Sequence, residues 1–229
     1  MPNPQGDASP TRRRFVTAGT AVAAASLAGC TAVNFVRGEA RFAADPVIVS
    51  EKTLNDTGYQ ETRVREQEVT RTFEAVGQRR DVTVVNVIAE YARTLNLLGA
   101  EIPGAVFLVL ATPKVRVLGQ TFNPVGRMTP SEFAETLGQQ FDTITNVTPA
   151  SQAEYTTPVG GRDTAVGRYD ADARLADLGI SIDIRLEITE PVALGDDFVV
   201  CLAAYPRVID EGDAVAMLLE GVTGETSST

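Results

Sequence analysis

The ten residues from Ile180 to Thr189 alternate strictly between an aliphatic and a polar side chain. The aliphatic side chains are Ile180, Ile182, Ile184, Leu186 and Ile188, and the polar ones are Ser181, Asp183, Arg185, Glu187 and Thr189. A period of two places all the aliphatic side chains on one face of a β-strand and does not fit a helix. The segment therefore predicts an antiparallel sheet with one face in the core and the other in water.

Much of the remaining chain has the same period. Strands are predicted around 46–50, 62–76, 82–91, 105–111, 146–157, 163–172, 179–190 and 196–204, with 62–76 and 82–91 forming a hairpin. A helix over 82–95 is the alternative, but the crowding of β-branched residues there favours a strand. Turns and loops are expected at 55–58, 98–104, 119–127, 158–161 and 191–197.

Two segments have the pattern of an amphipathic helix. Thr129 to Glu132 is typical of a helix start, with Thr129 as N-cap, Pro130 in the first helical position and Glu132 closing a capping box. Asp210 can cap a second helix, whose apolar face consists of Val215, Leu218, Leu219 and Val222. We expect the α+β class: an antiparallel β-sheet with two main helices packed on one face, in a single domain over 45–223 that a disordered tail over 224–229 follows.

Residues 1–29 have the layout of an export signal. Three arginines, Arg12 to Arg14, precede an apolar run from Phe15 to Leu27, and small residues then lead to Cys30. This run is too short and too weakly apolar for a stable membrane-spanning helix. We expect a leader over 1–29, followed by a tether over 30–44.

Two motifs in this region resemble known processing signals. Residues 11–16, with the pair Arg12 and Arg13, resemble a twin-arginine signal, and Leu27-Ala28-Gly29-Cys30 resembles a lipobox. The lipobox implies cleavage before Cys30 and lipid attachment to its sulfur. The twin-arginine signal implies that the domain folds before export. The alternative is that Cys30 is a small apolar residue in a helical leader.

The chain is acidic, with 30 Asp and Glu against 20 Lys and Arg and a formal net charge of −10. This balance argues against nucleic acid as a partner, because phosphates attract a basic face. Only Lys52 and Lys114 are lysines. Such a composition resembles that of proteins from salt-loving archaea, and an ordinary acidic domain is the alternative.

With this leader and composition, the whole chain resembles a haloarchaeal lipoprotein family of unknown function. The cues in the body are Thr57-Gly58-Tyr59, Ala111-Thr112-Pro113 and Phe122-Asn123-Pro124-Val125-Gly126. The resemblance implies a membrane anchor on the extracytoplasmic face of the cell membrane and implies no activity. The expected order of strands and helices also resembles the PsbP-like fold, which unrelated proteins share.

Few residues in the sequence suggest chemistry. The absence of histidine excludes Ser-His-Asp triads and histidine zinc sites. Asp170 and Asp172 do not begin an EF-hand loop, because Leu175 and Ser181 stand where Gly and Glu are required, although a looser carboxylate site with Asp177 stays open. Cys201 lies in an apolar strand and is expected to be a buried thiol.

We expect a lipoprotein that binds a partner or a small ligand, with no catalytic residue, metal or cofactor. An extracytoplasmic hydrolase, carboxylate-based or metal-assisted, is the alternative, since acidic pairs occur at Asp196-Asp197 and at Glu211 with Asp213. An assembly subunit of a membrane complex is a further alternative and would expose an apolar patch. Asn55 and Asn146 each begin a glycosylation acceptor pattern.

Overall fold

The computed structural model describes residues 39–75, 78–97, 100–117, 120–121, 123–175 and 179–224. The strands are β1 (Glu39–Ala43), β2 (Val47–Val49), β3 (Gln60–Ala75), β4 (Gln78–Leu97), β5 (Ala100–Pro113), β6 (Arg116–Val117), β7 (Gln120–Thr121), β8 (Ile144–Val159), β9 (Arg162–Leu175), β10 (Ile180–Thr189), β11 (Val192–Leu194), β12 (Asp197–Pro206) and β13 (Val222–Gly224). The helices are α2 (Glu51–Thr57), the 3₁₀ helix η2 (Pro124–Arg127), α3 (Pro130–Gln140) and α4 (Gly212–Glu220).

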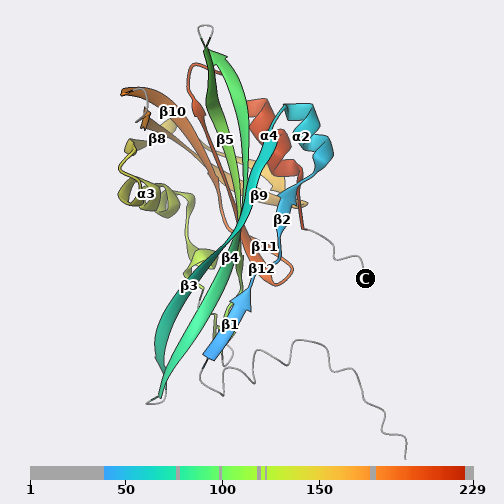
Figure 1. Cartoon of the computed structure of the whole chain (residues 1–229), viewed down its shortest axis with the longest axis vertical. Coiled ribbons are helices and arrows are strands. Elements are labelled where there is room, and N and C mark those ends of the chain that lie inside the picture. Colours follow the sequence, from blue (N-terminus) through green and yellow to red (C-terminus); the bar gives the residue numbers. More distant parts are fainter. Residues whose placement is uncertain are drawn as a thin grey trace, which may run out of the picture.

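One nine-stranded sheet dominates the fold (Figure 1). Its path is β1-β4-β5-β12-β10-β9-β8, and β3 and β11 add to β4 and β12. The sheet is mixed, because β1 runs parallel to β4 whereas the hairpins β3–β4, β4–β5, β8–β9 and β9–β10 are antiparallel. The 20-residue strand β4 therefore bonds β3 along one edge and β1 and then β5 along the other.

The predicted α+β class, with two main helices on one face of an antiparallel sheet, is wrong. The chain is mostly β, with a large mixed sheet and three small α-helices. Moreover, α3 packs against β8, β9 and β10, whereas α4 packs with α2 on the opposite face (Figure 1). The order of elements on which the PsbP-like resemblance depended also differs, because α2 precedes the first hairpin and β1, β11 and β13 were not predicted.

The helices are divided between the faces because the central strands are apolar on both sides. In β12, Val199, Cys201 and Ala203 join the core beneath α4, while Val200 joins the core beneath α3. Successive side chains of a strand point to opposite faces, so a continuous apolar run requires cover on both. Within the described ranges, no helix is long and apolar enough to cross a membrane.

Most of the predicted strands are confirmed. The hairpin predicted at 62–76 and 82–91 is β3–β4, so the helix alternative over 82–95 is wrong. The predicted segment 105–111 lies within β5, a central strand between β4 and β12. The four later strands are β8, β9, β10 and β12, and Gly160 and Gly161, with φ of 56° and 74°, form the turn predicted at 158–161.

The predicted helix start at Thr129 is confirmed in detail. The Thr129 hydroxyl accepts the Glu132 N–H and the Glu132 carboxylate accepts the Thr129 N–H, which completes the capping box of α3. By contrast, Glu211 and not Asp210 is the N-cap position of α4, although Asp210 accepts the Gly212 N–H at 3.3 Å.

Several local predictions are wrong. Residues 39–43 of the predicted tether form β1, and the loops predicted at 119–127 and 191–197 contain β7, η2 and β11. Residues 55–57 belong to α2, which ends at Gly58 with φ of 75°, so only Gly58 has turn geometry. Residues 100–104 belong to β5 rather than to a loop. Gly224, predicted in the tail, lies in β13, and the rest of the tail is outside the described residues.

In β10, only half of the predicted pattern is confirmed. The aliphatic side chains Ile184, Leu186 and Ile188 are buried beneath α3, as expected. On the face predicted to be wet, however, Glu187 and Thr189 are also buried. The physical reason is that this face of the sheet is also covered, because the core that includes α4 packs against it. A buried glutamate requires partners, and these define the candidate site.

Candidate functional site

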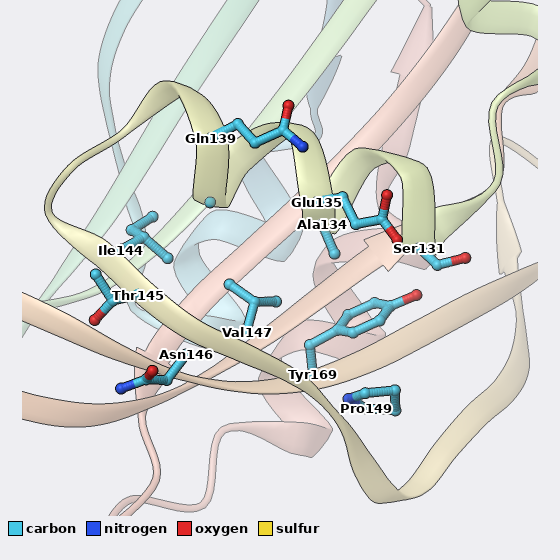
Figure 2. Close-up of a pocket in the computed structure, with 11 residues that line it drawn as sticks. Ser131, Ala134, Glu135, Gln139, Ile144, Thr145, Asn146, Val147, Pro149 and Tyr169 are labelled. Carbon is cyan, nitrogen blue, oxygen red and sulfur yellow. The ribbon is translucent and has the colours of Figure 1, made fainter.

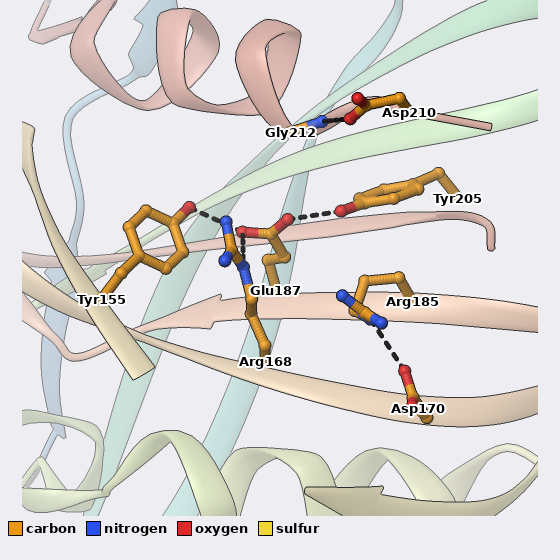
Figure 3. A network of polar contacts seen from close by, with 8 residues as sticks. All are labelled: Tyr155, Arg168, Asp170, Arg185, Glu187, Tyr205, Asp210 and Gly212. Carbon is orange, nitrogen blue, oxygen red and sulfur yellow. Dashed lines mark hydrogen bonds and ion pairs between the residues drawn. The ribbon is translucent and has the colours of Figure 1, made fainter. Parts of the chain in front are cut away.

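Glu187 lies at the centre of a buried polar cluster (Figure 3). The Tyr155 hydroxyl donates to Oε2 at 2.6 Å, and the Tyr205 hydroxyl donates to Oε1 at 2.5 Å. Arg168 Nε lies 3.3 Å from Oε2, and its guanidinium also stacks 4.1 Å from the centre of the Tyr155 ring. Both carboxylate oxygens are therefore hydrogen-bonded, which offsets the cost of burying the charge.

The sheet register brings these residues together. Glu187 lies opposite Arg168 of β9 and opposite Ala203 of β12, and Arg185 lies opposite Asp170 and Tyr205. Directly opposed side chains lie about 5 Å apart on the same face of an antiparallel pair. The i, i+2 pairs Arg168/Asp170 and Arg185/Glu187 therefore place each arginine against a carboxylate of the neighbouring strand.

Asp170, beside Arg168 on β9, pairs with two further arginines. Arg185 Nε donates to Asp170 Oδ1 at 2.8 Å, and Arg207 Nε lies 3.5 Å from the same oxygen. Arg207 comes directly after β12, and its backbone N–H donates to the Asp183 carbonyl oxygen. Asp170 thus holds two guanidinium groups close together.

The three arginines and Tyr205 form one wall of a cavity of about 400 Å³. It is lined by Arg168, Arg185, Tyr205, Arg207, Val208, Ile209, Asp210 and Gly212. Within the described part of the chain, each arginine meets its carboxylate through Nε, and no Nη atom of the three donates to a protein group. The six Nη atoms thus keep their hydrogen-bonding capacity, and the cavity volume is within the usual range of small-molecule sites.

A similar buried cluster lies where α4 begins. Glu211 is fully buried, forms a close ion pair with Arg93 and accepts the Tyr59 hydroxyl at 3.3 Å. Arg93 also donates through Nη1 to the Thr57 carbonyl oxygen at 3.2 Å and lies 5.7 Å from the Tyr59 ring centre. This cluster joins α2, β4 and α4, and its carboxylate is already paired.

A second cavity, of about 420 Å³, lies between α3 and β8 (Figure 2). Ala134, Ile144, Val147 and Tyr169 contribute an apolar floor, and Ser131 and Glu135 lie along α3 at its side. None of its lining residues is an arginine or lysine. The arginine-lined cavity therefore has the stronger means of selecting a charged ligand.

The family model described as a domain of unknown function, DUF6517, matches residues 46–223. This match covers well over half of the chain. The chain belongs to the DUF6517 family. The match includes every residue of the Glu187 cluster, the Glu211 cluster and both cavities. No curated protein matches the chain.

The predicted leader residues of this DUF6517 protein, Arg12, Arg13, Leu27, Ala28, Gly29 and Cys30, lie outside the described residues. Asn55 is exposed on α2, but the Thr57 hydroxyl of its acceptor pattern is buried and donates to the Thr53 carbonyl oxygen. Asn146 is exposed with φ of 54°, and its amide donates to Asp172 at 2.6 Å. Neither contact tests glycosylation.

The residues considered for metal or acid–base chemistry do not converge. Asp170 pairs with arginines, Asp172 accepts from Asn146, and Asp177 lies outside the described residues. In the part of the chain that the structure describes, no group of three or more Cys, Asp or Glu side chains could hold a metal ion. Asp197 is buried and accepts the Asp45 N–H, and burial raises its pKa.

Cys201 is a buried free thiol, as predicted. Burial raises the pKa of this thiol to about 12, and its backbone N–H donates to Thr189 Oγ1 at 2.9 Å. A thiol with so high a pKa is protonated at neutral pH and is a poor nucleophile.

The Glu187 cluster was missed because the alternation in β10 placed Glu187 on a face predicted to be exposed. The charge pattern of two neighbouring strands could have indicated this cluster. Arg168-x-Asp170 and Arg185-x-Glu187 are complementary when their strands are antiparallel. No short motif in the sequence connects these strands to Tyr155, Tyr205 or Arg207.

The five tyrosines predict an unusual alkaline titration. Burial raises the pKa of each, to about 12 for Tyr59, and the Glu187 carboxylate raises the pKa values of Tyr155 and Tyr205 further. The unfolded chain ionises near pH 10, so stability is complete below that pH and falls as the pH rises above it. We expect the tyrosinate absorbance of Tyr59, Tyr155 and Tyr205, whose pKa values are raised most, to appear only together with loss of the circular dichroism of the sheet. Ionisation of all five tyrosines near pH 10 in the folded protein would contradict this.

Proposed function

We propose that the DUF6517 domain is the binding module of a lipoprotein of a halophilic archaeon, anchored through Cys30 to the extracytoplasmic face of the membrane after twin-arginine export. The leader motifs, the lipobox and the lysine-poor acidic composition support this location. The observation that supports binding is the arginine-lined cavity, in which three guanidinium groups are held by carboxylates through Nε and make no Nη hydrogen bond to another described residue.

The carboxylates do not favour a hydrolase. A carboxylate-based hydrolase needs an acid and a base that face the substrate across a cleft. Glu187 and Glu211 are buried but already neutralised by Arg168 and Arg93. Of the four carboxylates in the predicted acidic pairs, Asp196 and Asp213 are exposed and Asp197 accepts a backbone N–H. We therefore do not propose hydrolysis.

An assembly subunit is not favoured either. The large apolar side chains that are exposed among the described residues are Val64, Phe141, Ile180, Val208 and Met217. They belong to five different elements or loops of the chain, so no single element presents an apolar face for docking.

Isolation of the full protein from the membranes of its host at native salt tests the binding function. We expect a small molecule to co-purify with the wild-type protein, detected by mass spectrometry after denaturation, and to be lost from the Arg185→Gln/Arg207→Gln variant. Arg162→Gln removes an exposed arginine far from the cavity lining and should retain the molecule. A molecule retained equally by the double variant, or none with the wild type, would count against the proposal.

A further inference from the structure

The cavity lining is rich in arginine, although the molecule as a whole is acidic. The chain carries a net charge of −10, yet three arginines and one aspartate line the cavity, which is a net +2 for the wall. Asp170 and Glu187 do not line the cavity but pair with all three arginines, so the three guanidinium groups and the three carboxylates are neutral as a whole, while the guanidinium groups are the ones at the cavity. In an acidic protein, such a wall favours an anion over a cation or a neutral molecule.

The three guanidinium groups are held in position by the protein before any ligand binds. Arg168 is fixed by Glu187 and by the Tyr155 ring, and Arg185 and Arg207 are fixed by one oxygen of Asp170 (Figure 3 shows Arg168, Arg185 and their carboxylates). The side chains of Arg168 and Arg185 are only 22% and 25% exposed, so solvent and salt screen them less than surface arginines. Holding each planar group by Nε leaves its Nη edge for an oxyanion at little further cost in side-chain entropy.

The number of guanidinium groups indicates the shape of the anion. A carboxylate has two oxygens, and its acceptor sites lie in one plane. A phosphate group presents oxygens in three dimensions and can accept from several guanidinium groups at once. A phosphate monoester also carries about −1.5 to −2 at pH 7, and an ionised acceptor strengthens the hydrogen bonds from guanidinium groups.

The remaining lining indicates that the phosphate is part of a larger molecule. The cavity of about 400 Å³ is in the range of sites for small organic ligands. Val208 and Ile209 contribute apolar surface to it, and Val208 is 78% exposed in the turn after β12. An apolar group attached to the phosphate would cover this valine.

We propose that the cavity binds a small phosphate monoester, with its phosphate on Arg168, Arg185 and Arg207 and its organic part against Val208 and Ile209. This inference names the ligand class for the proposed binding function and rests on it. The shared chemistry belongs both to soluble phosphate esters and to the headgroup of a phosphatidic acid lipid, which the experiment separates.

Calorimetric titration of the purified full chain with phenyl phosphate tests the ligand class, with benzoate as a planar carboxylate bearing the same ring. We expect phenyl phosphate to bind the wild type and Arg162→Gln, and to bind about tenfold or more weakly to Arg185→Gln and to Arg207→Gln, because each variant loses a charged hydrogen-bond donor. Asp210→Asn, which removes the carboxylate of the wall, should tighten binding. Circular dichroism verifies that each variant is folded.

Equal binding of benzoate, unchanged binding in both arginine variants, or no binding would overturn the inference. Vesicles that contain phosphatidic acid identify the source: if they bind in an Arg207-dependent manner and displace phenyl phosphate, the ligand is a lipid headgroup, and if they do not, it is a soluble ester. A co-purified molecule that lacks a phosphate would overturn this inference and leave the binding function intact.

Discussion

The Glu187→Ala variant is expected to lose about 3–5 kcal/mol of unfolding free energy, the range for breaking one side of a buried ion pair. The carboxylate accepts hydrogen bonds from Tyr155 and Tyr205 and pairs with Arg168, so its removal leaves three donors without an acceptor beneath α4. Domains of this kind have a total stability of about 5–15 kcal/mol, and the variant would be near the limit of folding. Urea unfolding monitored by circular dichroism measures the change.

Two comparisons separate this cause from a general loss of charge. Glu190→Ala removes an exposed carboxylate just after β10 and should change the unfolding free energy by less than about 0.5 kcal/mol. The double variant Glu187→Leu/Arg168→Met removes both charges and should recover part of the loss, because the unpaired arginine carries much of the cost. A Glu187→Ala variant as stable as Glu190→Ala would show that the cluster does not hold β8, β9, β10 and β12 together.

Most strands could be predicted from the sequence, but the placement of the helices could not, because strand patterns are local and helix placement is not. Strand periodicity and the capping box at Thr129 depend on neighbouring residues, and the structure confirms them in β10 and α3. Which face a helix covers depends on contacts distant in the sequence. The apolar run from Phe198 to Ala204 could have shown that the sheet is covered on both sides, since both alternating sets of β12 are apolar.

The candidate site could not be predicted from any one segment. Arg168, Arg185 and Arg207 come from β9, β10 and the turn after β12, and only the register places them at one cavity. Glu211 was considered as half of an acidic pair with Asp213, but its partner is Arg93, 118 residues away. Long-range ion pairs of this kind leave no motif, because either residue alone is a common surface residue.

Replacement of Cys30 by Ser is expected to move the protein from the membrane to the medium. The proposed anchor is a lipid on the Cys30 sulfur, and serine has no thiol to accept it. Since the twin-arginine motif at Arg12 and Arg13 is unchanged in this variant, export itself should continue.

The most direct measurement is the intact mass of the wild-type protein extracted from the membrane fraction of its host, compared with Cys30→Ser collected from the medium. We predict a wild-type chain that begins at Cys30 and carries added lipid mass, and a variant without that mass in the soluble fraction. A wild-type protein found in the cytosol with residues 1–29 intact and no added mass would contradict the proposed anchored function.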